Sequence, residues 1–163
     1  MKMESLRDLY VDQLRDLYSA ENQILEALPM MADRASHPEL KAAFTEHEQV
    51  TREQVRRLEQ VFDTLGEKPS GHHCKGMEGL LKEGQELMKM KVESDVLDAG
   101  LITAAQRVEH YEMAGYGTVR TFARQLGLDD QAEILQRTLD EEGNTDHRLS
   151  MLAETVVNPD AMR

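Results

Sequence analysis

Several residue types are scarce in this chain of 163 residues. A single cysteine cannot form a disulfide within the chain, which favours a reducing compartment, and we expect a cytoplasmic protein. Tryptophan is missing, aromatic residues make up only 4% of the chain, and there are only four prolines. Leu, Ala, Glu, Gln, Arg and Met are abundant instead, as is typical of helices. We therefore expect an all-α fold without strands.

Positive charge and long apolar runs are scarce as well. The chain has 31 acidic and 19 basic residues, which gives a formal net charge of −12. Nucleic acids and anionic membrane surfaces are bound by basic faces, so we expect neither as a partner. No segment approaches the roughly 18 apolar residues that span a membrane, and the charged N-terminal sequence MKMESLRDLY is unlike a secretory signal.

Apolar residues recur at helical spacing along almost the whole chain, with breaks near residues 36–38, 66–71, 93–94 and 127–130. This pattern predicts five helices. They run from about Ser5 to Ala35, from Ser36 to Gly66, from Gly76 to Lys91, from Ser94 to Leu126, and from Asp129 or Asp130 to a point before Asn158 and Pro159.

The connections between the predicted helices indicate how they pack. The first and last pairs of long helices are joined by tight turns and should form antiparallel hairpins, while the short third helix lies in the connection between the hairpins. This order predicts a single domain over residues 1–163, a ferritin-like four-helix bundle of two hairpins joined by a crossover. The apolar face of the short helix suits either a lid on the bundle or a dimer contact.

Acidic residues and one histidine interrupt the inward-facing apolar positions of the four long helices. Buried charges are costly unless they are paired or bound to a metal, and facing carboxylates repel one another without a cation. Counting residues back to each hairpin turn places these side chains at similar heights. We therefore predict a site for one or two ions of iron, manganese or another divalent transition metal. The candidate ligands are Glu21, His47, Glu109, Glu112, Glu142 and Asp146.

Other interpretations of these residues remain open. The carboxylates can lie at the edge of the helix face, solvated or paired with arginine, and His47 can be a hydrogen-bonded core residue. Asp146 can bind the metal, accept a hydrogen bond from a ligand, or join two helices. Tyr18 and Tyr116 lie within one turn of candidate ligands and can donate to them or pack with the hydroxyl at the rim. Residues 72–74 (His-His-Cys) are too close in sequence to form a tetrahedral site alone.

Four segments carry a resemblance to a known family. They are SAENQ around Glu21, CKGMEGL at residues 74–80, AAQRVEHYEMAGYGT at residues 104–118 and TLDEE at residues 138–142. Together they resemble the YciE/YciF family of bacterial ferritin-like proteins. The resemblance implies a rubrerythrin-related bundle, dimers in at least some members, a two-metal carboxylate site, and a link to stress responses without an assigned reaction. By position, Glu21, Glu109, Glu112 and Glu142 match the family's candidate ligands.

One position departs from that family. Val50 stands three residues after His47, where members resembling YciF tend to have a carboxylate. A single metal, an asymmetric pair and a vestigial site all fit the remaining residues. We therefore expect a metal-binding protein, and the resemblance implies that it acts on a small oxidant, oxygen or peroxide. The alternative is a non-catalytic dimeric scaffold with a vestigial site. Storage of iron in a hollow shell is the weaker expectation.

Overall fold

The structure, a computed structural model, describes residues 3–163, which form helices and no strand. The prediction of an all-α fold is therefore confirmed for the described residues. The five main helices are α1 (Leu6–Arg34), α2 (Pro38–Leu65), α3 (Lys75–Lys89), α4 (Ser94–Gln125) and α5 (Asp129–Leu152). None of the described helices is long and apolar enough to cross a membrane.

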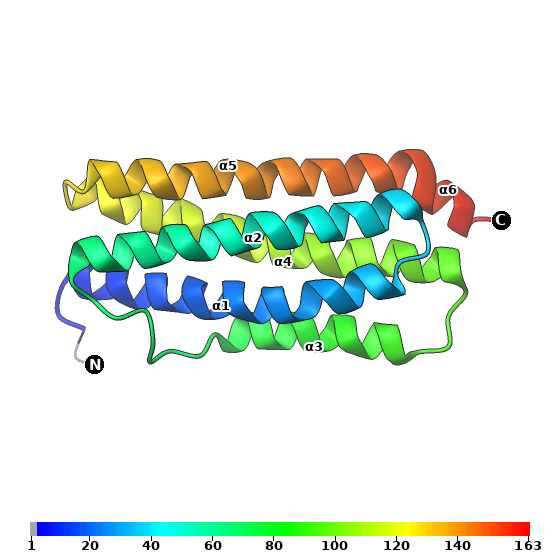
Figure 1. The fold of residues 1–163 in the computed structure, drawn as a ribbon, viewed down its shortest axis with the longest axis horizontal. Coiled ribbons are helices and arrows are strands. Elements are labelled where there is room, and N and C mark those ends of the chain that lie inside the picture. The colour runs from blue at the N-terminus through cyan, green and yellow to red at the C-terminus, as the bar shows by residue number, and fades with distance from the viewer. Residues whose placement is uncertain (1–2) are drawn as a thin grey trace.

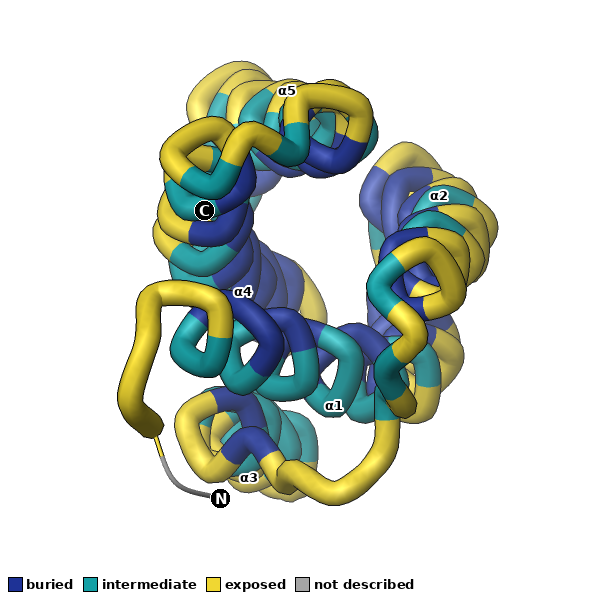
Figure 2. The backbone as a smooth tube through the Cα atoms, turned by 90° about the vertical axis from the view of Figure 1, so that its left-hand side faces the viewer, coloured by how far each residue is buried: buried dark blue, intermediate teal, exposed yellow. Residues whose placement is uncertain are grey.

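The four long helices form an elongated bundle (Figure 1). Helices α1 and α2 pack as one antiparallel hairpin and α4 and α5 as the other, with α1 against α4 and α2 against α5. The connection between the hairpins contains α3, which lies along the outer side of α1 and α4 (Figure 2). The short helix thus covers the side of the bundle, where its Met77 is fully buried.

Local signals in the sequence explain where the helices begin and end. The Ser5 hydroxyl accepts a hydrogen bond from the Asp8 N–H at the start of α1, and Cys74 Sγ accepts one from the Met77 N–H at the start of α3. Gly66 and Gly127 follow α2 and α4 with φ of 68° and 72°, in the left-handed region that glycine adopts readily. The predicted bounds of these helices therefore agree with the structure to within two residues.

The start of α2 differs from the predicted start at Ser36. His37 is the capping residue, and its Nδ1 accepts a hydrogen bond from the Glu39 N–H at 3.3 Å. The backbone N–H groups of Ser36 and His37 instead donate to the two carboxylate oxygens of Asp98 on α4, each at 2.8 Å. A tertiary contact from the other hairpin therefore holds this turn.

The end of the last helix also differs from the prediction that it stops before Asn158. Helix α5 ends at Leu152, a π-helical turn η1 (Ala153–Val157) follows, and α6 (Asn158–Ala161) continues the chain in helical form. Pro159 lies in the first turn of α6, where no N–H of that residue is needed. Proline therefore marks a new helical start here.

The bundle interior contains two apolar clusters separated by a polar layer. Each long helix contributes residues to both clusters, and buried polar side chains lie between these two sets of residues. On α1, for example, Leu17 belongs to one cluster, Ile24 to the other, and fully buried Glu21 lies between them. The polar layer is thus enclosed by apolar packing at both ends.

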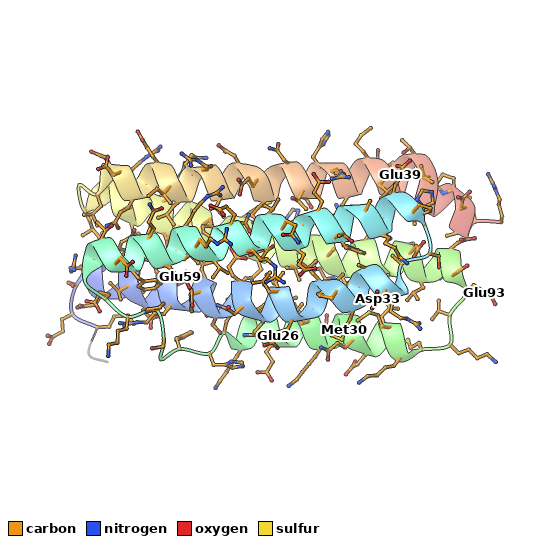
Figure 3. The ribbon with its side chains drawn as sticks, in the orientation of Figure 1. Glu26, Met30, Asp33, Glu39, Glu59 and Glu93 are labelled. Atoms are coloured by element: carbon orange, nitrogen blue, oxygen red, sulfur yellow. The ribbon has the colours of Figure 1, made fainter. Side chains whose placement is uncertain are left out.

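The remaining acidic residues are mostly on the outside. Figure 3 shows Glu26 and Asp33 on α1 and Glu39 and Glu59 on α2, all of which are exposed. Exposed carboxylates keep their hydration and cost little. The negative charge of the surface and the acidic residues of the interior are therefore separate features of the protein.

The Asp98 contact leads to a prediction about stability. Asp98 is 2% exposed and accepts two backbone hydrogen bonds, so Asp98→Ala should lower the free energy of unfolding by about 1–3 kcal/mol. Urea unfolding measures this loss. The matched control is Asp95→Ala, an exposed acid in the first turn of the same helix, which should cost less than about 1 kcal/mol. Equal losses in the two variants would contradict the role of Asp98.

Candidate metal centre

Each of the four long helices contributes at least one buried polar residue to the layer between the apolar clusters. Glu109 and Glu112 are three residues apart on α4 and therefore lie on one face of that helix. His47 comes from α2 and Glu142 from α5, in the middle of each helix. The layer consists of Glu21, His47, Thr51, Gln54, Glu109, Glu112, Thr138 and Glu142, all buried.

Four of these residues form a compact group. His47, Glu109, Glu112 and Glu142 each present one nitrogen or oxygen atom, and these atoms all lie within 4.8 Å of one another. His47 Nε2 is 3.0 Å from Glu109 Oε1, although their geometry is not that of a hydrogen bond. One imidazole and three carboxylates are a donor set suited to a divalent transition metal.

Glu21 lies outside the compact group but is part of the same layer. The Tyr116 hydroxyl donates to Glu21 Oε1 at 2.5 Å, and the other carboxylate oxygen is buried without a hydrogen-bond partner. Of the two tyrosines considered from the sequence, Tyr116 therefore contacts a candidate ligand. Tyr18 instead donates to the exposed Glu59 at 3.1 Å.

Buried polar atoms without a hydrogen-bond partner indicate whether the compact group suits a metal ion. Both ring nitrogens of His47, both oxygens of Glu112 and one oxygen each of Glu109 and Glu142 are buried without a hydrogen-bond partner. Leaving such atoms unpaired costs about 1–3 kcal/mol for each group, and more when the group is charged. A bound cation would be coordinated by one ring nitrogen of His47 and by carboxylate oxygens of the three glutamates, so the residues present fit a metal ion.

Burial and mutual repulsion raise the pKa of each carboxyl group in the layer. Desolvation, followed by the charge of Glu142, raises the pKa of Glu21 to about 8, and the Tyr116 hydrogen bond opposes this shift. Desolvation raises the pKa of Glu109 to about 7. The pKa values of Glu112 and Glu142 are also raised well above the usual range, mainly by desolvation. Without a cation, the folded protein therefore retains protons on this layer.

Gln54 is a residue of the site that the sequence analysis missed. Its side chain is fully buried, and Nε2 donates to Glu142 Oε1 and, at 3.2 Å, to Glu141 Oε2. Arg57 Nη1 pairs with the same oxygen, Glu141 Oε2, at 2.6 Å. The helical spacing of Gln54, seven residues after His47, was the available signal.

The structure places Asp146 beside the layer and outside the compact group. Gln106 Nε2 donates to Asp146 Oδ1 at 3.2 Å, and Asp146 Oδ2 lies 3.2 Å from His110 Nε2. His110 and His147 are exposed.

The carboxylates of the compact group are not paired with arginine among the residues that the structure describes. Within residues 3–163, no arginine forms an ion pair with a carboxylate of this group.

Residues 72–74 form a separate contact near the start of α3. His72 Nε2 lies 2.9 Å from Asp16 Oδ1, and Cys74 Sγ is 3.0 Å from the Tyr111 hydroxyl, which donates to Asp16 Oδ2. Neither His72 nor Cys74 belongs to a cluster of three or more metal-ligating side chains in the described part of the chain. These contacts fix the loop before α3 onto α1 and α4.

Comparison with known proteins identifies the family of the chain. The model of the family called domain of unknown function DUF892 matches residues 5–162. The chain belongs to this family. Protein YciF of Escherichia coli strain K12 is 41% identical over 162 residues, which cover 99% of this chain and 98% of that protein. The resemblance to the YciE/YciF family is thus confirmed.

Three solved structures share the fold. The crystal structure of the E. coli stress protein YciF matches with a TM-score of 0.92 at 41% identity, covering 96% of this chain and 99% of that one. YcfI of Rhodopseudomonas palustris, a proposed structural protein, matches with a TM-score of 0.88 at 41% identity, covering 91% and 95%. A protein from Xanthomonas campestris shares the fold at 22% identity, with a TM-score of 0.76 and 94% of each chain covered.

The raised pKa values predict how the metal-free protein responds to pH. The folded state holds protons that unfolded glutamic acids release above about pH 4.5, so the free energy of unfolding should fall as pH rises from 4.5 towards 8. Each raised pKa unit corresponds to about 1.4 kcal/mol, so the loss should amount to several kcal/mol and lower Tm by on the order of 10 °C or more. Thermal unfolding of chelator-treated protein between pH 5 and 8 measures it.

A variant that cannot ionise provides the control for this pH dependence. Glu112→Gln keeps the size of the side chain and removes one titrating group, so its Tm should depend less on pH than that of the original protein. An exposed counterpart, Glu133→Gln on α5, should keep the original dependence. Identical slopes in all three proteins would mean that the buried layer does not cause the effect.

Proposed function

We propose that this DUF892 protein is a ferritin-like metal protein of the bacterial stress response. The observation that carries the proposal is the compact group of one histidine and three glutamates, buried at mid-bundle with unpartnered donor atoms. Membership of the family and the 41% identity to the E. coli stress protein YciF support the proposed role in the stress response.

His47, Glu109, Glu112 and Glu142 would hold the ion. A reduced iron or manganese ion bound there would supply electrons to a small oxidant such as oxygen or peroxide. The protein's own contribution is to fix the donors in place: the amide of Gln54 orients the Glu142 carboxylate, and the paired α4 glutamates approach from one helix face. The apolar clusters on both sides exclude water from the layer.

Further parts of the proposal concern assembly and location. We propose a homodimer, as the family resemblance implies, and place the protein in the cytoplasm because a lone cysteine is typical of reducing compartments. The second candidate function is a structural scaffold. Val50 in place of a carboxylate and the structural role proposed for YcfI of R. palustris favour it.

Metal content separates these two functions. Protein purified without chelator should contain a transition metal, and Glu112→Gln or Glu142→Gln should weaken its binding at least about tenfold, because each removes a charged donor. Elemental analysis and calorimetric titration with Mn²⁺ or Fe²⁺ measure this. Glu133→Gln, which changes an exposed acid on the same helix as Glu142, should leave binding unchanged.

Thermal unfolding gives an independent measurement of the same binding. A metal at about 100 times its Kd should stabilise the folded protein by about 2.7 kcal/mol, and should not stabilise Glu112→Gln to the same extent. Metal-free protein whose Tm is unchanged by added Fe²⁺ and Mn²⁺ would contradict metal binding and favour the scaffold.

A substitution of Glu21 tests whether the compact group holds an ion without this carboxylate. Since Glu21 lies outside the compact group and its Oε1 already accepts from Tyr116, Glu21→Gln should retain at least one ion per chain, whereas Glu112→Gln should not. Elemental analysis of both variants, with Tyr116→Phe as a control for the hydrogen bond alone, measures the difference. Complete loss of metal in Glu21→Gln would make Glu21 an essential ligand.

A further inference from the structure

A cavity of about 220 Å³ lies between α2 and α5, next to the metal centre. Its wall contains residues of all four long helices, so it reaches the interior of the bundle. Leu28 on α1 and Ala105 on α4 lie at its inner side, and α2 and α5 form its two flanks. Figure 2, which looks along the bundle, shows α2 and α5 set apart on either side of the interior.

The greater part of the exposed wall of the cavity is apolar, and the uncharged polar residues Asn144 and Thr145 of α5 also line it. Leu28, Phe44 and Leu149 are each at most 3% exposed and also belong to one of the apolar clusters. Val50 is part of the same wall. At this position a carboxylate would bring a charge into the cavity, whereas valine keeps this flank apolar.

The cavity shares one residue with the candidate centre. His47 belongs to the compact ligand group and also lines the cavity, together with Glu141, the neighbour of Glu142 in the chain. A molecule in the cavity therefore lies beside the imidazole of His47. No other described residue belongs both to the compact group and to this cavity wall.

The charged groups around the cavity neutralise each other. Arg148 on α5 pairs with Glu46 on α2, and both residues line the cavity at its exposed edge. Glu141 is paired with Arg57. An anionic ligand would meet no free cation there and would be repelled by a protein of net charge −12. A cationic ligand would have to compete with the arginines for their carboxylates.

The size of the cavity sets the size of the ligand. An apolar cavity of roughly 150 Å³ is sufficient to bind benzene in a protein interior. The volume of about 220 Å³ here is therefore sufficient for a molecule of benzene size with one or two further atoms. A drug-sized ligand would extend beyond this volume, since pockets for such ligands begin at about 300 Å³.

We propose that this cavity is a binding pocket for a small, neutral, mainly apolar organic molecule, held against the His47 side of the metal centre. The part that concerns the metal rests on the proposed function, whereas the pocket itself does not. The pocket gives the centre an organic ligand class beyond the small oxidant, and Val50 forms the apolar part of its α2 flank together with Ala43 and Phe44.

Fluorobenzene is a suitable probe, and ¹⁹F NMR of metal-free protein measures its binding. We expect saturable binding that weakens at least tenfold in Val50→Phe, which fills the cavity from α2. Ala43→Leu, a second filling variant on the same helix, should act in the same direction. The matched control is Val96→Phe, which enlarges an exposed valine on α4 and should leave binding unchanged. Circular dichroism establishes that each variant is folded.

Cobalt-loaded protein tests whether the pocket adjoins the centre. Bound Co²⁺ should broaden the fluorobenzene signal, and Glu112→Gln should remove the broadening while fluorobenzene still binds. Absence of saturable binding, or equal binding in Val50→Phe, Ala43→Leu and Val96→Phe, would overturn the pocket. Binding without broadening in protein shown to contain Co²⁺ would overturn its position beside the metal. Failure to take up Co²⁺ would instead overturn the proposed function. Fluorobenzene binding to Val50→Phe and Ala43→Leu would still show whether the pocket exists.

Discussion

The burial of several carboxyl groups in one layer is the constraint on which this structure depends. Each carboxylate loses hydration in the bundle interior, and neighbouring negative charges add repulsion. The protein has two ways to reduce this cost, which are to retain protons or to bind a cation. Both act on the same atoms, so metal affinity and protonation must compete.

The rest of the bundle compensates for this layer. Two apolar clusters, one on either side, contribute the burial that a continuous core would otherwise supply. Hydrogen bonds from Tyr116 and Gln54 fix individual carboxylates, and the Asp98 contact holds the turn between α1 and α2 against the second hairpin. The fold thus holds a destabilising group of side chains in a defined arrangement, as is common in functional sites.

Val50 connects the incomplete ligand set with the neighbouring cavity. A carboxylate at this position would add a charged group to the α2 side of the bundle interior. Valine leaves His47 with an apolar neighbour and a cavity open to a small molecule. A valine where the resemblance leads us to expect a carboxylate therefore changes what can reach the centre, and does not by itself indicate that the centre has decayed.

The sequence by itself determined the helices, their approximate bounds and the acidic residues at inward positions, because helical periodicity and capping are local properties. Tertiary structure decided how these residues combine. It joined His47, Glu109, Glu112 and Glu142 in one group, linked Glu21 to Tyr116, and placed Asp146 with Gln106 and His110. It also brought Asp98 to the α2 start. Such contacts depend on the rotation and axial position of one helix relative to another, which sequence spacing within a single helix does not specify.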